Sequence, residues 1–326
     1  MWFQTLTGFK ESGVDDVASQ FSCDGEWLTS RANGRRMRAG RFEMVSLSEL
    51  RGRVAEHNRA PASLRLREVL ANARGLHLDP ASAGALFQVA SQFNMLEMTR
   101  PSLTPEDGID RYENDHTQGP VCAIACGAGT IYRNYFVPVG HYQGQSARHQ
   151  LNGLADMTRA IGVEIPVRNG YALPSASQLD EICLAIGACD ELSRGELMGL
   201  LQIGMQWDTE VTLDNAGHTV AQAYCAALPI AYASHAAERW EPFARLVLDA
   251  AYEATLASAV LNADATRNNS AYLTLLGGGA FGNPTPWIVA ALQRACATYS
   301  TIDLDVAVVS YGRANPRLVD VLDSVR

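Results

Sequence analysis

Apolar and polar positions alternate along the chain in a way that separates short buried strands from amphipathic helices. The clearest pattern comes late: an apolar strand at 272–276, a glycine-rich loop at 277–283, and a helix that opens at Thr285 and Pro286. Threonine is a frequent N-cap, and proline suits the first helical turn because that position needs no amide hydrogen. With a further apolar strand at 306–310, the pattern predicts a strand–loop–helix–strand unit.

The remaining elements follow from the same periodicities. Strands are predicted at 36–45, behind an Asn33-Gly34 turn, and at 84–90 and 207–213. Helices are predicted at 46–55, 63–74, 121–132 and 241–261, and after the capping boxes that start at Ser177 and Ser193. The segment 219–233 fits a strand or a helix. Strands that alternate with helices predict an α/β fold with a mixed or parallel sheet.

Composition narrows the function classes. Of 326 residues, 47% are hydrophobic and 19% charged, as in ordinary globular proteins. A net charge of −9 argues against a nucleic-acid partner, because such binding requires neutralised phosphates. The start of the chain lacks the basic and apolar regions of a signal peptide, and no segment reaches the ~18 apolar residues of a membrane span. The seven scattered cysteines fit a reducing compartment, so we expect a cytoplasmic protein without a membrane partner.

The glycine-rich loop is the strongest candidate for ligand binding. Small side chains let backbone amides approach an anion, and the following helix start adds a partial positive charge. The loop also matches the pattern G-x-G-x-x-G, but only 44 residues follow Gly282, too few for the rest of a dinucleotide-binding domain. A tight packing turn remains the structural alternative. The candidate ligand-binding residues of the loop are Gly278, Gly279, Ala280, Phe281, Gly282 and Asn283.

Residues 104–120, which we call the acidic segment, hold the candidate catalytic groups. Its five carboxylates are Glu106, Asp107, Asp110, Glu113 and Asp115. Crowded carboxylates can bind a cation, serve in acid–base chemistry, or keep a loop solvated. Asp107 also fits a capping turn with Thr104. Because a buried helix follows the segment, we expect Asp107 and Asp115 to point into a cleft. Mg²⁺ is compatible with these acids but not required, and no cofactor is predicted.

Two further residues lie where strands end. Asn94 follows the strand at 84–90, and ligands of open α/β sheets bind at the carboxyl ends of strands. Its amide can both donate to and accept from a ribose hydroxyl, although a simple turn cap is an equal alternative. Tyr311 follows the last predicted strand, where it can stack on adenine or merely be exposed.

Three pieces of the chain resemble the macrodomain family: the strand and polar turn near 89–97, the run LTLLGGGAFGNPTP, and the strand VAVVSYG. The nearest branch is similar to poly(ADP-ribose) glycohydrolases and includes bacterial effectors that remove ADP-ribose from arginine on ubiquitin. The resemblance covers residues 80–318. It implies a three-layer α/β/α sandwich with a mixed sheet at 81–326, behind an N-terminal extension at 1–80. It also implies that the loop binds a diphosphate, with Phe281 along the ribose and Asn94 at the first ligand loop.

The same resemblance implies an activity. The glycine run followed by a glutamate pair, typical of true poly(ADP-ribose) glycohydrolases, is absent, so we expect hydrolysis of a single ADP-ribose from a protein side chain. Arginine is the expected side chain, and ubiquitin is one candidate protein. Asp107 and Asp115 take the place of the missing glutamates. The alternatives are a non-catalytic ADP-ribose reader, a nucleotide-sugar or NAD-using enzyme, and a scaffold with a structural loop.

Overall fold

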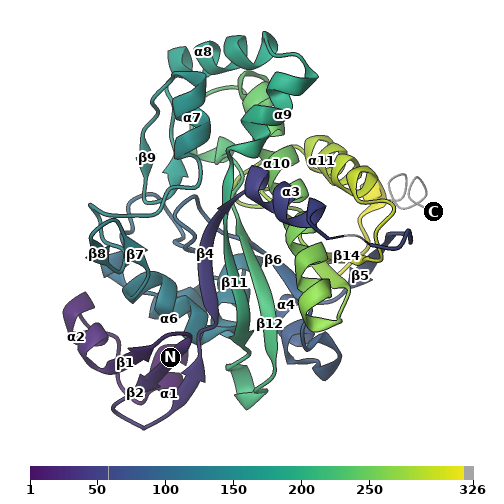
Figure 1. The fold of residues 1–326 in the computed structure, drawn as a ribbon. Helices are drawn as coiled ribbons and strands as arrows, with labels where there is room; N and C mark the ends of the chain where they lie inside the picture. The colour runs from purple at the N-terminus through teal and green to yellow at the C-terminus, as the bar shows by residue number, and fades with distance from the viewer. Residues whose placement is uncertain (58, 319–326) are drawn as a thin grey trace.

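Seven strands form one mixed sheet in the computed structural model, which describes residues 1–57 and 59–318 (Figure 1). In spatial order they are β4 (Arg41–Ser46), β11 (Gln202–Glu210), β12 (Thr219–Cys225), β6 (Leu86–Ala90), β13 (Ser270–Leu273), β14 (Asp305–Ser310) and β5 (Arg65–Leu70). The last five run parallel, and β11 is antiparallel to both of its neighbours. The predicted mixed sheet is confirmed.

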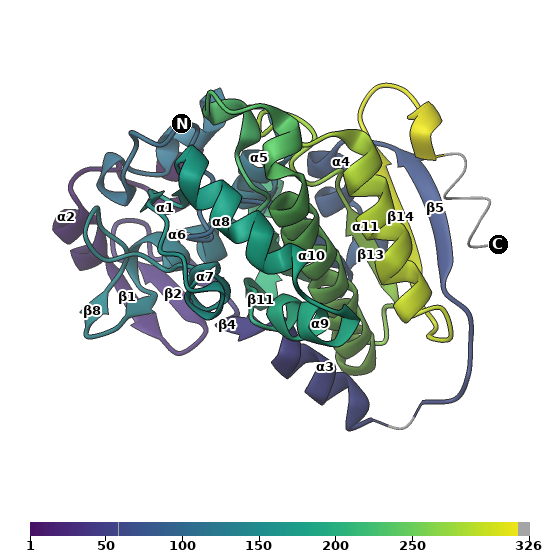
Figure 2. The ribbon, with the colours of Figure 1, turned by 90° about the horizontal axis from the view of Figure 1, so that it is seen from above.

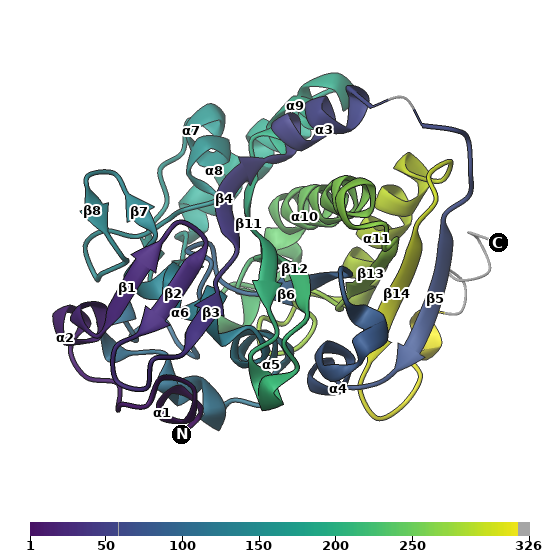
Figure 3. The ribbon, with the colours of Figure 1, turned by 60° about the horizontal axis from the view of Figure 1, so that its bottom comes forward.

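Helices cover both faces of this sheet. One face carries α3 (Leu47–Ala55), α8 (Ala176–Gly187), α9 (Glu191–Gly199), α10 (Ala237–Thr266) and α11 (Thr285–Thr298). The other carries α4 (Ala73–Leu78), α5 (Gln118–Ala125) and α6 (Gly127–Tyr135), as Figure 3 shows. Side chains of β6 alternate between the two: Leu86 packs with α10, whereas Phe87 packs beside Cys126. The α/β class and its three layers are confirmed.

Smaller elements surround these layers. The N-terminal part has α1 (Trp2–Thr7), α2 (Val14–Ser19), β1 (Phe21–Asp24), β2 (Trp27–Ser30) and β3 (Arg36–Arg38). Its core, which includes Phe3 and Leu28, packs on Ile131 and Tyr135 of α6. Two hairpins, β7 (Pro138–Val139) with β8 (Tyr142–Gln143) and β9 (Val167–Arg168) with β10 (Tyr171–Ala172), flank α7 (Ala155–Ile161). Figure 2 shows α8 and α9 beside α10.

Residues 1–80 supply both edges of the sheet, which the sequence did not reveal. Strand β4 borders β11, and β5 borders β14. The predicted helix at 63–74 is wrong, because the structure has β5 there, followed by α4. Leu64 and Leu66 are buried at the two-residue spacing of a strand, and Asp305 of β14 binds Arg65 and Arg67. Charged residues lie between the leucines, and they made the two-residue pattern of buried positions hard to recognise in the sequence.

Several element boundaries differ from those predicted. The strand at 36–45 is divided into β3 and β4 at Gly40, and the helix at 121–132 is divided into α5 and α6 at Cys126. Helix α8 is capped by Ser175 and α9 by Asp190, each upstream of the predicted box. The capping box at Ser46 is confirmed, and the ambiguous segment 219–233 begins with β12.

Two further properties concern the cysteines and the helices. Each of the seven cysteines is free. In the described ranges, we find no helix with the length and apolar character needed to cross a membrane.

Candidate functional site

The cleft begins where two parallel strands separate. Strand β13 pairs with β6 only at Leu86 and Phe87, whereas β12 follows β6 as far as Ala90. Beyond Phe87, the side chain of Gln118 takes the place of β13: its Nε2 donates to the Gln88 carbonyl (2.7 Å), and its Oε1 accepts from the Ala90 amide (2.9 Å). The backbone of β6 is thus satisfied while a gap opens at the carboxyl ends of the strands.

Chain topology makes this gap a favoured position for a ligand. After β6 the chain passes to α5 on one face, and after β13 it passes to α11 on the opposite face. Neighbouring strands whose connections leave in opposite directions mark the switch point of an open α/β sheet, which is where ligands bind.

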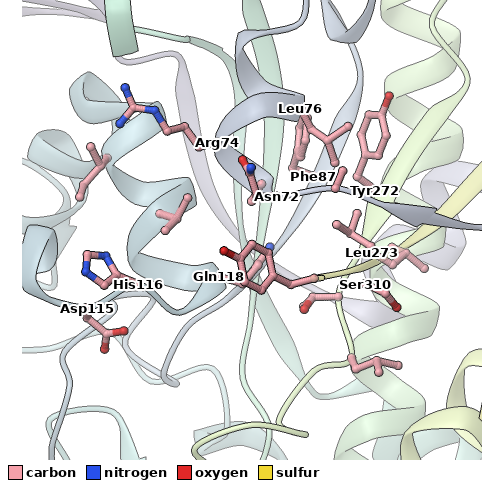
Figure 4. Close-up of a pocket in the computed structure, with 18 of the residues that line it drawn as sticks. Asn72, Arg74, Leu76, Phe87, Asp115, His116, Gln118, Tyr272, Leu273 and Ser310 are labelled. Atoms are coloured by element: carbon pink, nitrogen blue, oxygen red, sulfur yellow. The ribbon is translucent and has the colours of Figure 1, made fainter. Parts of the chain in front are cut away.

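A two-part cleft occupies this position. The wide arm, of about 1110 Å³, lies over the carboxyl ends of β5, β13 and β14 (Figure 4). The narrow arm, of about 200 Å³, lies between the end of β6 and the glycine-rich loop. The residues that line both arms are Asp115, Gln118, Thr274 and Leu275. Because these residues line both cavities, the two arms of the cleft lie side by side.

The glycine-rich loop forms one wall of the narrow arm. A Cβ at Gly277, where φ is 76°, would lie 2.5 Å from the Ala227 Cβ, so only glycine fits. Buried Asn283 closes the turn by donating from Nδ2 to the Leu228 carbonyl (2.8 Å) and from its backbone amide to Gly277 (2.9 Å). The part of the loop that lines the arm is Gly277, Gly279, Ala280 and Phe281.

The other predicted loop residues support this wall from behind. Gly278 packs on Ile288 of α11, and Gly282, with φ of 73°, packs on Ala231. Helix α11 then begins at Thr285, with Pro284 as N-cap in place of the expected threonine. No side chain caps this helix start within the described residues. The positive end of the helix dipole therefore lies next to the loop.

Three aromatic rings close the narrow arm. Phe281 contacts Tyr171 and Tyr232, with ring centroids 5.4 and 5.7 Å apart, and the two tyrosines are 5.1 Å from each other. The Tyr171 hydroxyl donates to the Met98 carbonyl (2.5 Å). Sequence reasoning found Phe281 but missed both tyrosines. They come from distant segments, and no spacing in the sequence links them to the loop.

Asp115 is the predicted acid that faces the cleft. It follows the short helix η3 (Asp110–Asn114), is half-buried, and lines both arms (Figure 4). Its Oδ1 accepts from the Thr117 amide at 2.8 Å, just before α5. In the described part of the chain, Oδ2 has no hydrogen-bond partner. One carboxylate oxygen is thus fixed by the backbone while the second is available to a ligand.

Asp107 lies outside the cleft. Its Oδ2 accepts from the Thr104 amide (2.8 Å) and the Thr104 hydroxyl (3.0 Å), completing a capping box around η2 (Pro105–Asp107). These hydrogen bonds to Thr104 hold the pKa of the Asp107 carboxyl below its usual value. The sequence allowed Asp107 either to point into a cleft or to cap a turn with Thr104, and in the structure it caps the turn.

Asn94 also lies behind the site rather than in it. It is fully buried, donates from Nδ2 to Gln150 Oε1 (2.9 Å), and accepts at Oδ1 from the Leu96 amide (3.2 Å). The residues of this turn that line the narrow arm are Ser91, Gln92, Glu97, Met98 and Thr99. The Ser91 hydroxyl is buried without a hydrogen-bond partner among the described residues, which suits contact with a bound ligand.

A buried ion pair supports the end of the narrow arm. Glu97 binds Arg133 at 3.0 Å, and both side chains are fully buried. The Arg133 guanidinium lies 3.6 Å from the centre of the Tyr224 ring. Burial raises the pKa of Glu97 to about 7, against the opposing charge of Arg133. This pair holds the turn in place, because Arg133 also donates to the Met95 carbonyl (2.9 Å).

Tyr311 lies at the rim of the wide arm. Tyr311 is 85% exposed and follows Ser310, the last residue of β14. Asn72, which follows β5, lines the same arm. No group of three or more His, Cys, Asp or Glu side chains that could hold a metal ion occurs in residues 1–57 and 59–318.

Comparisons with known proteins give a consistent but distant likeness. No family model matches the chain, and no curated protein matches its sequence. Among solved structures, it is similar to poly(ADP-ribose) glycohydrolase from Thermomonospora curvata bound to the inhibitor ADP-HPD, at 13% identity and a TM-score of 0.44, over 93% of this chain and 92% of that one. It is also similar to the Deinococcus radiodurans glycohydrolase in complex with ADP-ribose, at 11% identity and a TM-score of 0.43, over 98% and 97%. These values are too low to assign a family or an activity.

Proposed function

We propose that this chain binds ADP-ribose in the two-part cleft and hydrolyses the bond that joins ADP-ribose to a protein side chain. One observation carries the proposal: the glycine-rich loop, the ring of Phe281 and the carboxylate of Asp115 line the same narrow arm. The arm lies at the switch point of the sheet. Backbone amides of the loop are available there to an anionic ligand, in addition to the acidic side chain.

The shape of the cleft suggests how ADP-ribose is held. The diphosphate lies on the loop at Gly279 and Ala280, with the start of α11 behind it. The adjoining ribose lies along Phe281, within reach of Ser91. The wide arm receives the adenosine, with Tyr311 at its rim as a stacking partner. A volume of about 1110 Å³ is ample for a nucleoside.

The reaction needs a carboxylate near the anomeric carbon. Asp115 orients a water molecule, accepts its proton, and stabilises the positive charge that develops on the ribose. The water oxygen bonds to the anomeric carbon as the bond to the side-chain nitrogen breaks. The departing nitrogen keeps the electron pair and takes up a proton. The products are free ADP-ribose and the unmodified side chain, and no step passes through a metal or a cofactor.

The preferred substrate rests on the sequence resemblance. That resemblance supports ADP-ribosylated arginine, with ubiquitin as one candidate protein, and the absence of a glutamate pair argues against cleavage of poly(ADP-ribose) chains. Asp107 has no role in this proposal other than the cap, because it does not line either arm.

A non-catalytic ADP-ribose reader is the second candidate. It is favoured because Asp107 lies outside the cleft. Among the described residues that line the narrow arm, Asp115 is the one acid from the acidic segment. The other carboxylate there, Glu97, is already paired with Arg133.

Two matched substitutions separate these candidates. We expect Asp115→Asn to lower turnover of an ADP-ribosylated arginine substrate by about 100-fold or more while ADP-ribose affinity stays within about threefold. Asp107→Asn, its control, should keep turnover and lose only part of the cap, about 1 kcal/mol of stability. Turnover by wild type that persists in Asp115→Asn would contradict the mechanism. ADP-ribose binding without turnover by wild type would identify a reader.

A further inference from the structure

The acidic segment is anchored from outside by a carboxylate of the N-terminal part. Glu11, which follows α1, accepts from the Ile109 amide at Oε1 (2.9 Å) and from the Asp110 amide at Oε2 (2.7 Å). The buried hydroxyl of Tyr135, on α6, donates to the same carboxylate at 2.5 Å. Glu11 thus binds the acidic segment and α6, which lie 98 and 124 positions away from it in sequence.

Close approach of this carboxylate depends on Gly108. The residue has φ of 82°, and a Cβ at this position would come within 2.3 Å of Glu11 Oε2. Glycine therefore leaves the space that the carboxylate occupies, and the two amides that follow point at it. Successive amides that converge on one acceptor group form a backbone nest. Burial raises the pKa of the Glu11 carboxyl, and the hydrogen bonds from Tyr135 and the two amides oppose that shift.

Other contacts along the same segment support this anchor. The Trp2 indole donates to the Ile109 carbonyl at 3.3 Å, and the Trp2 amide donates to Glu113 at 3.1 Å. Phe3 packs in one apolar cluster with Ile109 and Tyr112. The N-terminal part therefore contacts the acidic segment through both its polar backbone and its apolar side chains.

The anchored segment leads directly to Asp115. The Asp115 amide donates to the Tyr112 carbonyl (3.1 Å), and the Tyr112 hydroxyl accepts from the Glu97 amide (2.9 Å) at the end of the narrow arm. The turn from Gly108 to Asp115 is thus fixed at its start by Glu11 and at its middle by Tyr112. Movement at the start would change where the Asp115 carboxylate lies in the cleft.

We propose that Glu11 is a positioning residue of the candidate site: it holds the acidic segment through two backbone amides and thereby sets the place of Asp115. The inference rests on the proposed function, since Asp115 is the group that it positions. Glu11 lines neither arm of the cleft and does not bind the loop that receives the diphosphate. It should therefore affect turnover and leave ADP-ribose affinity unchanged.

Glu11→Gln tests this proposal with the least change in shape. Glutamine keeps one carbonyl oxygen but presents an NH₂ group to the second amide, so one backbone amide loses its acceptor. We expect turnover of an ADP-ribosylated arginine substrate to fall about tenfold or more, as for the loss of one charge-assisted hydrogen bond, with the Kd for ADP-ribose within about twofold of wild type. Tyr135→Phe, which removes one donor to Glu11, should give a smaller loss of turnover.

Amide hydrogen exchange provides a readout independent of activity. Exchange of residues 108–115 should rise in Glu11→Gln while the rest of the chain is unchanged. Asp15→Asn is the matched control, because it removes an exposed charge of α2 from the same N-terminal part. Wild-type turnover in Glu11→Gln, or a loss of ADP-ribose affinity in step with turnover, would overturn the proposal. If wild type itself shows no turnover, the proposed function fails, and unchanged exchange at 108–115 would then overturn the anchor as well.

Discussion

At the scale of the residue, the local environment gives two aspartates of the acidic segment different roles. Asp115 faces the cleft, and one of its oxygens accepts a hydrogen bond from a backbone amide. The Oδ2 of Asp107 instead accepts from the amide and the hydroxyl of Thr104. Both are aspartates beside helical turns, so their types and spacing do not distinguish them. The difference arises because Glu11 and Tyr112 orient the turn between them.

The buried Glu97 predicts a specific pH dependence of stability. Its pKa is raised from an ordinary value of 4.5 to about 7 by burial, so between these values the folded protein holds a proton that the unfolded chain has released. The free energy of unfolding should therefore decrease, by roughly 3 kcal/mol, as the pH rises through this window. Above pH 7 the carboxyl is ionised in both the folded and the unfolded protein, so the free energy of unfolding no longer decreases on its account.

Denaturant unfolding of wild type and Glu97→Gln from pH 4.5 to 8 measures this effect. The variant has no titrating carboxyl at this position, so its free energy of unfolding should lack this decrease. His77, whose pKa burial lowers to about 4, acts in the opposite direction below pH 6.5 and is common to both proteins. Equal slopes in the two proteins would contradict the assignment to Glu97.

At the scale of the element, the strand–loop–helix unit could be predicted because its signals are local. Glycines at 277 and 282 adopt positive φ, and Pro286 lies in the first turn of α11. The rest of the site depends on contacts between distant segments. Asn94 follows the correct strand, but it lies in a turn in which Met95 has φ of 62°, and its side chain packs against Gln150. The Tyr171–Phe281 contact joins residues 110 positions apart and left no periodic signal.

Two glycines of the loop should respond differently to alanine. At Gly277 a Cβ would collide with Ala227 and Asn283, and φ is 76°, so we expect Gly277→Ala to destabilise the fold by about 1–3 kcal/mol and to weaken ADP-ribose binding. At Gly279 a Cβ would meet no atom within 4 Å, so Gly279→Ala should keep wild-type stability.

Thermal unfolding and ADP-ribose titration of both variants check this pair. Because Gly279 lines the narrow arm, its variant should lose about tenfold or more in affinity through the lost backbone approach to the diphosphate. Full affinity in Gly279→Ala would place the diphosphate elsewhere. Wild-type stability in Gly277→Ala would show that the turn tolerates a side chain.

At the scale of the whole molecule, residues on both sides of position 80 build one sheet. Strands β4 and β5 cover the edges of β11 and β14, and Glu11 holds the segment that carries Asp115. A chain beginning at residue 81 would expose both edges and leave Asp305 without Arg65 and Arg67.

We therefore expect residues 81–326 alone to lack a cooperative thermal transition, as measured by circular dichroism. Cooperative unfolding of that fragment, together with binding of ADP-ribose, would instead support residue 80 as a domain boundary.

Calorimetric titration of the full chain with ADP-ribose tests the central proposal most directly, with NAD, AMP and ribose 5-phosphate as controls. We expect micromolar binding of ADP-ribose, weaker binding of each control, and loss of binding when Gly282 is replaced by a bulky residue. No heat and no thermal shift with ADP-ribose would contradict the proposal and leave the glycine-rich loop as a packing turn.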